Sequence, residues 1–280
     1  MSIQIRQSNL ELYRCLAMLM IVACHWGLLT NLTSMVHDNQ LTAPSNFYYI
    51  LRMWGKMGIN CFLLITGYFM CKSNISVKKF LKLYLQVTFY SLVISLTFNL
   101  WGGEDYTVKD WVLLMLPFRE IESDNFVHAF MIWWLFIPFF NILIKGMDWK
   151  THKQLILLLV IVFTILPILP DSIYRISINP LCWYSVIYFI ASFIQKYPDQ
   201  IYESSSAKVW GIITLVCLVL DVLSVFGFIV LSQEMNRFIS PYKFMADSNA
   251  PLALVTAVAS FMFFKNLKIK YSPLLSRKNG

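Results

Sequence analysis

The chain has 280 residues, of which 58% are hydrophobic and 14% are charged. Soluble domains carry about 25% charged residues, so this composition and a mean hydropathy of +0.61 exclude an ordinary soluble protein and indicate an integral membrane protein. The net charge of +8 does not point to nucleic acid, because positive charge in a membrane protein first reports topology. We therefore expect the lipid bilayer as a partner and no nucleic acid.

Eight apolar runs are long enough to cross a bilayer, which takes about 20 residues. They are residues 10–30, 47–71, 80–100, 126–145, 154–170, 180–196, 208–231 and 249–264. The remaining segments leave no room for a separate soluble domain, which needs at least about 50 residues. The sequence therefore predicts an all-α fold, a polytopic transmembrane helix bundle of about eight spans that forms a single domain over residues 1–280.

The connections between these runs alternate in charge. Of the 23 Lys and Arg residues, 15 fall in segments that would share one side of the membrane, 5 on the other side and 3 within the spans. Since cytoplasmic loops are enriched in Lys and Arg, both termini are predicted to be cytoplasmic. No small-residue cleavage site follows the first run, so we expect it to stay in the mature protein.

The cysteines lie in or beside apolar runs, without a CxxC pair or a neighbouring His cluster. We interpret them as small packing residues and expect neither a disulfide framework nor a metal site. They are Cys15, Cys24, Cys61, Cys71, Cys182 and Cys217.

Ionisable groups inside the spans are informative, because each costs about 3 kcal/mol at the centre of a spanning helix unless it is paired or faces a polar cavity. The first run carries Glu11, Arg14 and His25. Arg14 and His25 are eleven residues apart, which places them on one helix face about 16 Å apart. Arg14 either snorkels and pairs with Glu11 or binds a ligand. His25 either bonds to a neighbouring helix or acts as a base near neutral pH.

The second run carries Arg52, Lys56 and Asn60, which recur every four residues and so form a polar stripe. Two cations there need water, a carboxylate or a ligand. Asp221 in the seventh run is either their partner or a lone cavity residue.

Other polar and aromatic residues fall near the ends of the runs. We interpret His37, His128 and His152 as surface residues. Trp26, Trp54 and Trp133 lie near the outer side, where they are either interface aromatics or platforms for a sugar ring.

The first run, NLELYRCLAMLMIVACHWG, resembles the opening helix of the membrane-bound acyltransferase-3 family, in which an arginine and a histidine have ten residues between them. The second run, GINCFLLITGYFM, is similar to a family stretch that ends in Ser/Thr-Gly-Tyr, matched here by Thr66, Gly67 and Tyr68. Further stretches, WWLFIPFFNILIK among them, resemble the branch that O-acetylates bacterial surface polysaccharides. The resemblance covers essentially the whole chain.

Two features depart from the family pattern. Many relatives carry Arg-x-x-Arg at the start of the third span, whereas this chain has Lys79 and Lys82 at that spacing. Lysine meets a phosphate as a point charge and loses the bidentate geometry of arginine. Family members usually have about ten spans, so the resemblance implies that the C-terminal spans of the family are missing here.

The resemblance implies an enzyme, an O-acetyltransferase of the bacterial cytoplasmic membrane that moves acetyl from cytoplasmic acetyl-CoA to a hydroxyl of an envelope polysaccharide or lipid-linked glycan. Acetyl-CoA is then the acyl donor, and no cofactor is permanently bound. Arg14, with Lys79 and Lys82, would hold the donor phosphates. His25 would serve as the general base or as a transient acyl carrier.

Three residues are weaker candidates. Lys56 or Asn60 would stabilise the developing oxyanion, and Trp26 would stack on a sugar. A secondary transporter or glycan flippase is an alternative, since buried ionisable groups also line transport paths, although no internal repeat is evident. An inactive, shortened remnant of the acyltransferase is another.

Overall fold

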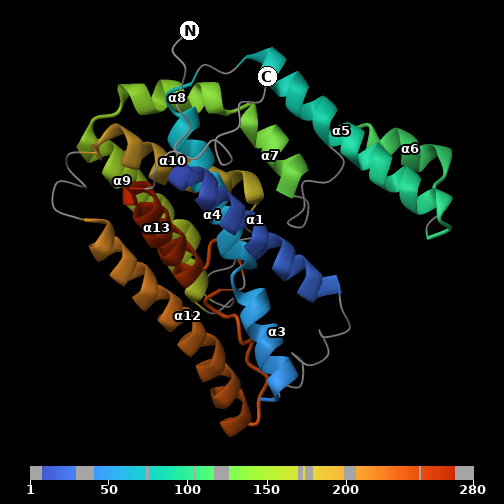
Figure 1. Cartoon of the computed structure of the whole chain (residues 1–280). Coiled ribbons are helices and arrows are strands. Elements are labelled where there is room, and N and C mark those ends of the chain that lie inside the picture. Colours follow the sequence, from blue (N-terminus) through green and yellow to red (C-terminus); the bar gives the residue numbers. More distant parts are fainter. Residues whose placement is uncertain are drawn as a thin grey trace.

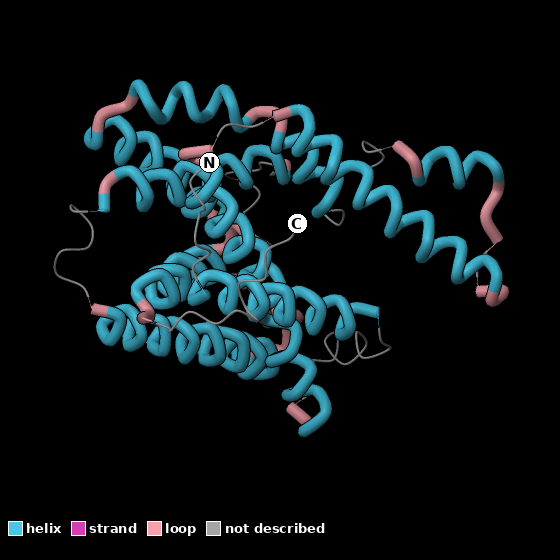
Figure 2. Tube along the Cα trace, turned by 45° about the horizontal axis from the view of Figure 1, so that its top comes forward, coloured by secondary structure: helices cyan, strands magenta, loops and turns pink. Residues whose placement is uncertain are grey.

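A computed structural model describes residues 8–29, 41–73, 76–103, 105–116, 126–169, 173, 179–198, 206–245 and 247–268. Within these ranges the chain forms helices and turns and no strand (Figures 1 and 2). The helices are α1 (Ser8–Leu29), α3 (Ala43–Met53), α4 (Gly55–Met70), α5 (Val77–Leu100), α6 (Val108–Leu114), α7 (Phe126–Trp134), α8 (Ile137–Gly146), α9 (Trp149–Val160), η1 (Ile161–Ile165), η2 (Leu166–Ile168), α10 (Pro180–Lys196), α12 (Ala207–Glu234) and α13 (Pro251–Asn266).

All eight predicted runs are largely helical, and the predicted fold class, a helical membrane bundle, is confirmed. Four helical stretches are long and apolar enough to cross a membrane: α1, α5, α12 and the stretch Trp149–Ile168. The bent pair α7 and α8 would be a fifth. Helices α4, α10 and α13 have 16, 17 and 16 residues, about 25 Å each. By length and composition, the described part of the chain thus holds four or five full crossings rather than eight.

Two of the predicted runs are interrupted. The run 126–145 bends by 55° between α7 and α8. Pro138 explains this bend, because it has no N–H to donate to the Trp134 carbonyl and its ring would clash with that carbonyl. The run 47–71 breaks at Trp54, whose φ of −94° and ψ of 1° separate α3 from α4. No proline marks this second break, and a contact with a distant helix, described below, holds the Trp54 side chain there.

Helix α4 is the centre of the bundle and packs against α1, α10 and α13. Glycines permit these close approaches: a Cβ at Gly58 would lie 2.9 Å from the Ala17 carbonyl oxygen, and one at Gly67 would lie 2.8 Å from the Ala191 Cβ. Small residues are the usual means by which membrane helices approach closely. Gly67 belongs to the Thr-Gly-Tyr stretch, so that stretch has a packing role between α4 and α10.

The two described ends of the chain meet at one end of the bundle, which we call the basic end. The Asn9 Nδ2 donates to the carbonyl oxygens of Phe264 and Leu267 at 2.9 and 3.2 Å, joining the start of α1 to the end of α13. In another contact between distant segments, Lys196 Nζ of α10 donates to the Met147 carbonyl oxygen at 2.6 Å. The described start of α1 and end of α13 thus lie together, and the cytoplasmic location of this end remains a prediction from the charge distribution.

The opposite end, which we call the hinge end, contains α3, the last turns of α12 and residues 235–245. Helices α3 and α12 are in contact there, and Tyr49 of α3 packs edge-on against Tyr242. A Cβ at Gly27 would lie 3.2 Å from the Tyr48 ring, so α1 also reaches this end.

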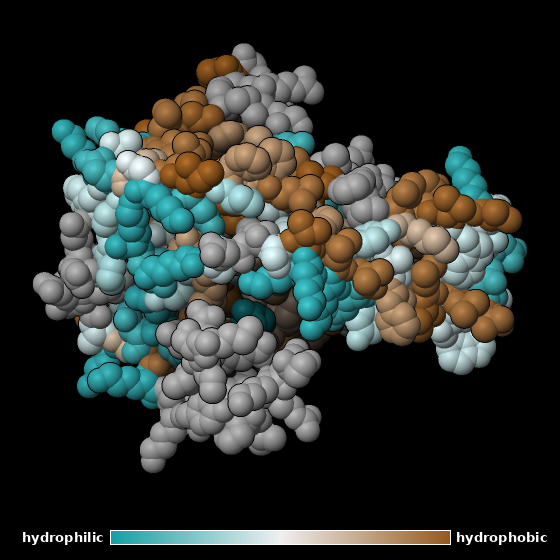
Figure 3. Space-filling view, turned by 90° about the horizontal axis from the view of Figure 1, so that it is seen from above, coloured by the Kyte–Doolittle hydropathy of each residue, from teal (hydrophilic) through white to brown (hydrophobic). Residues whose placement is uncertain are grey.

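Helices α5 and α6 form an arm that stands away from the bundle (Figures 1 and 2). The arm touches the bundle through Phe80, which stacks on Trp134 at 5.6 Å, and Tyr84 donates to the Met115 carbonyl oxygen within the arm. Hydrophobic residues prevail on its surface, whereas hydrophilic ones gather over the bundle when the basic end is seen from above (Figure 3). Lipid is the natural environment for such a helix.

Candidate active site

Helix α1 carries Arg14 and His25 on one uninterrupted helix, as predicted. Its buried residues Leu10, Tyr13 and Ala17 face the bundle, while His25 is exposed near the hinge end. His25 lies within a stretch apolar enough to span a membrane. An exposed imidazole there is costly unless water or a polar ligand meets it, so this side of α1 is the candidate site.

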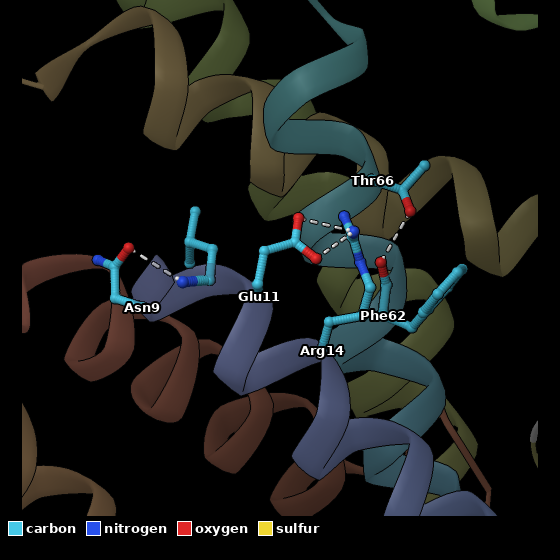
Figure 4. A network of polar contacts seen from close by, with 6 residues as sticks. Asn9, Glu11, Arg14, Phe62 and Thr66 are labelled. Carbon is cyan, nitrogen blue, oxygen red and sulfur yellow. Dashed lines mark hydrogen bonds and ion pairs between the residues drawn. The ribbon is translucent and has the colours of Figure 1, made fainter. Parts of the chain in front are cut away.

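At the basic end, Arg14 Nη1 donates to both carboxylate oxygens of Glu11, at 2.9 and 3.0 Å. This pairing is one of the two alternatives considered for Arg14, and it is the one salt bridge within the described ranges. The Arg14 side chain is 34% exposed and extends along the side of α1 turned toward α4, where Thr66 lies (Figure 4). A guanidinium has five N–H donors, so the pair leaves donors for a phosphate.

The predicted phosphate partners Lys79 and Lys82 lie on the exposed first turns of α5. Ser76 caps this helix, its Oγ accepting from the Lys79 amide at 3.4 Å. Both lysines therefore start the arm at the basic end rather than lining the α1 face that carries Arg14.

The predicted polar stripe of Arg52, Lys56 and Asn60 is divided by the break at Trp54. Arg52 and Lys56 stay partly exposed at the hinge end. Asn60 is fully buried: its Nδ2 donates to the Ser248 carbonyl oxygen at 2.6 Å, and its Oδ1 accepts from Trp183 Nε1 at 2.9 Å. These bonds commit Asn60 to packing, so we do not retain it as an oxyanion donor.

Asp221 contacts the break at Trp54. Its side chain is fully buried at the middle of α12, and its two oxygens accept from Trp54 Nε1 at 3.3 Å and from Thr256 Oγ1 at 3.1 Å. The contact with Trp54 joins residues 167 positions apart and holds the α3–α4 junction against α12 and α13. Asp221 is thus bonded to neutral donors instead of to the cations on either side of Trp54.

The three tryptophans differ in exposure and in hydrogen bonding. Trp133 is buried and donates to Ser185 Oγ at 3.1 Å, and Trp54 is held by Asp221. Trp26 is 53% exposed next to His25. Of the three indoles considered for a sugar, only Trp26 presents an open face beside the site.

The prediction that His152 is a surface residue is wrong. The side chain is fully buried in α9, with Nε2 3.1 Å from the Phe189 carbonyl oxygen and the ring edge-on to Phe193. The burial could not be predicted from the basic segment around it, which includes Lys150 and Lys153, because the partner lies on α10. His128 is partly buried at the start of α7, and His37 lies outside the described residues.

All six cysteines are free. Cys24, Cys61 and Cys217 are buried packing residues, as predicted, whereas Cys15 and Cys182 are exposed on apolar helices. A Cβ at Gly55 would overlap the Cys24 side chain, so α1 and α4 touch directly beside His25.

Comparison with known proteins identifies the family of the chain. A family model described as an acyltransferase domain matches residues 7–275. The chain belongs to the acyltransferase-3 family and is therefore a membrane acyltransferase. Neither curated proteins nor solved structures gave a match to the chain.

Proposed function

We propose that the protein is an O-acetyltransferase of the bacterial cytoplasmic membrane, which moves acetyl from cytoplasmic acetyl-CoA to a hydroxyl of an envelope polysaccharide or lipid-linked glycan. The observation that supports this proposal is the family match over residues 7–275, combined with Arg14 and His25 on one unbroken helix. The first supplies acyl transfer, and the second supplies a cation and an imidazole at fixed separation.

The geometry of α1 suits a long donor. CoA has its phosphates at one end and its thioester at the other, joined by a pantetheine arm comparable in length to the roughly 16 Å between Arg14 and His25. Arg14 binds phosphate in this proposal while Glu11 keeps one edge of the guanidinium fixed. Lys79 and Lys82 add positive charge at the same end of the bundle.

His25 acts on the acceptor hydroxyl in one of two ways. As a general base, it takes the hydroxyl proton while the oxygen attacks the thioester carbonyl carbon; the C–S bond breaks, and the departing thiolate takes up the proton to give CoA thiol and an acetyl ester. As an acyl carrier, its nitrogen first displaces the thiolate. The hydroxyl oxygen then attacks the acetyl carbon, the N–C bond breaks to restore the imidazole, and the hydroxyl proton passes to the thiolate.

The test is transfer of label from [14C]acetyl-CoA to host envelope glycan by the purified protein in lipid nanodiscs. His25→Ala should lower transfer by at least about 100-fold, as expected for a positioned acid–base group, with CoA binding unchanged. Met18→Ala is the matched control, because Met18 is 47% exposed on the same helix. Most of the transfer surviving in His25→Ala would exclude the mechanism, and no label in any glycan from the wild type would exclude the function.

A further inference from the structure

Two cations at the hinge end are not used by the donor half of the reaction. Arg52 ends α3 and Lys56 begins α4, on either side of Trp54, and both side chains are partly buried. Lys56 also lies in the first turn of its helix, where the helix dipole adds positive potential. The pair is therefore a concentrated positive site within a largely apolar bundle.

The described neighbours of Arg52 are aromatic rather than acidic. Arg52 Nη1 lies 3.4 Å from the Tyr48 hydroxyl, and its guanidinium carbon is 5.2 Å from the centre of the Tyr242 ring. Burial raises the pKa of the Tyr242 phenol far above its usual value, so this ring stays neutral beneath the guanidinium. Within the described ranges the one salt bridge is Arg14–Glu11 at the other end of α1.

The nearest buried acid does not neutralise the pair either. Asp221 directs its two oxygens to Trp54 Nε1 and Thr256 Oγ1. By holding Trp54, it fixes the junction from which Arg52 and Lys56 project. The carboxylate thus holds the junction between the two cations, and these two hydrogen bonds go to neither of them.

The cations lie beside the reacting residue. Gly55, between them in the chain, packs directly on Cys24, the residue that precedes His25. An anion bound there would lie beside the turn of α1 that carries His25.

We propose that Arg52 and Lys56 bind an anionic group of the acceptor, and that the acceptor is therefore an acidic polysaccharide carrying carboxylate or phosphate. An anion bound by charge-assisted hydrogen bonds offsets the cost of two cations in a region of low polarity. The bound anion places a neighbouring sugar hydroxyl toward His25. This proposal rests on the proposed function.

The test compares acceptors under the same labelled-donor assay. Host envelope polysaccharide is separated by anion exchange into acidic and neutral pools, and lipids are extracted separately. The acidic pool should take up at least about tenfold more acetyl per mass than the neutral pool, the ratio that one charge-assisted hydrogen bond provides. Label found mainly in the neutral pool overturns the proposal, and label found mainly in the lipid extract assigns the anion site to a lipid headgroup instead.

Substitutions link the preference to the two residues. Arg52→Gln and Lys56→Gln should each lower transfer to the acidic pool at least tenfold, mainly through KM, while CoA affinity is unchanged. Lys56→Arg keeps the charge and should retain the preference for the acidic pool. Lys243→Gln, which removes an exposed cation next to Tyr242, is the matched control. An unchanged KM in the double variant Arg52→Gln/Lys56→Gln would overturn the assignment, whereas absence of label in every fraction from the wild type would remove the proposed function and this inference together.

Discussion

Cations at the basic end and at the hinge end of the bundle have different partners. At the basic end, Arg14 is held by both oxygens of Glu11, so a phosphate must share the guanidinium with an existing carboxylate. At the hinge end, the partners of Arg52 among the described residues are the phenols of Tyr48 and Tyr242, and Asp221 is bonded to neutral donors. The basic end therefore holds an ion pair that is already formed, whereas the hinge end holds the proposed anion site.

The basic end and the hinge end are predicted to face opposite sides of the membrane. In a variant whose six cysteines are replaced, Ser240→Cys at the hinge end should react with an impermeant thiol reagent in intact cells. Ser76→Cys at the start of α5 should react only after the cells are opened. This all-or-none difference follows from the 15 to 5 distribution of Lys and Arg. The reverse pattern would invert the assignment of donor and acceptor ends.

Arg14→Ala should change CoA affinity, whereas the same substitution at the hinge end should not. Loss of a charge-assisted contact to phosphate costs about 1.5–3 kcal/mol, so CoA affinity should fall by about 10- to 150-fold. Arg14→Lys should recover part of it, because a point charge remains without the planar fork. Arg52→Ala should leave CoA affinity unchanged. Equal CoA affinity in wild type and Arg14→Ala, measured by calorimetry, would restrict Arg14 to a topological role.

Asp221→Ala tests whether the carboxylate holds the hinge end in place. It leaves Trp54 Nε1 and Thr256 Oγ1 buried without their acceptor, which should cost about 1–3 kcal/mol of stability. Asp221→Asn keeps one acceptor oxygen and should cost less. Thermal unfolding measures the loss. Transfer to the acceptor should fall more than CoA affinity, and a matching fall in both would show that Asp221 supports the whole bundle.

Glu11→Gln probes the basic end more gently. Removing the carboxylate frees Arg14 and takes away a charge that repels phosphate, so CoA affinity should rise a few-fold. The helix loses an i,i+3 ion pair, which contributes about 0.2–0.5 kcal/mol. A CoA titration of both proteins measures the change. Weaker CoA binding in Glu11→Gln would mean that Glu11 orients Arg14 more than it competes for it.

Local sequence pattern was sufficient for the helices and for the shared face of Arg14 and His25. Apolar runs of membrane length have few alternatives to helix, because backbone groups must be satisfied internally. The contact that holds Trp54 at the break could not be predicted, since its partner Asp221 lies on another helix, 167 positions away. The burial of His152 and the commitment of Asn60 likewise depend on partners at distant positions, Phe189 in one case and Trp183 in the other. Sequence thus located the polar residues, while tertiary contacts decided which are free to act.

The smallest expected effect concerns Asp148, which starts α9 at the basic end. Its Oδ1 accepts from the Thr151 amide at 3.0 Å, and hydrogen bonds from Thr151 lower the pKa of this exposed carboxyl below its usual value of 3.8. A lowered pKa means that the ionised cap stabilises the folded state above that usual value and loses the contribution as the pH falls through the lower, folded-state pKa. Other carboxylates titrate in the same range, so the measurement is the difference in melting temperature between wild type and Asp148→Asn from pH 7 to pH 3. Asparagine keeps the capping oxygen without the charge, so the difference should shrink as the pH falls, and a difference that stays constant would mean that the charge of Asp148 contributes nothing.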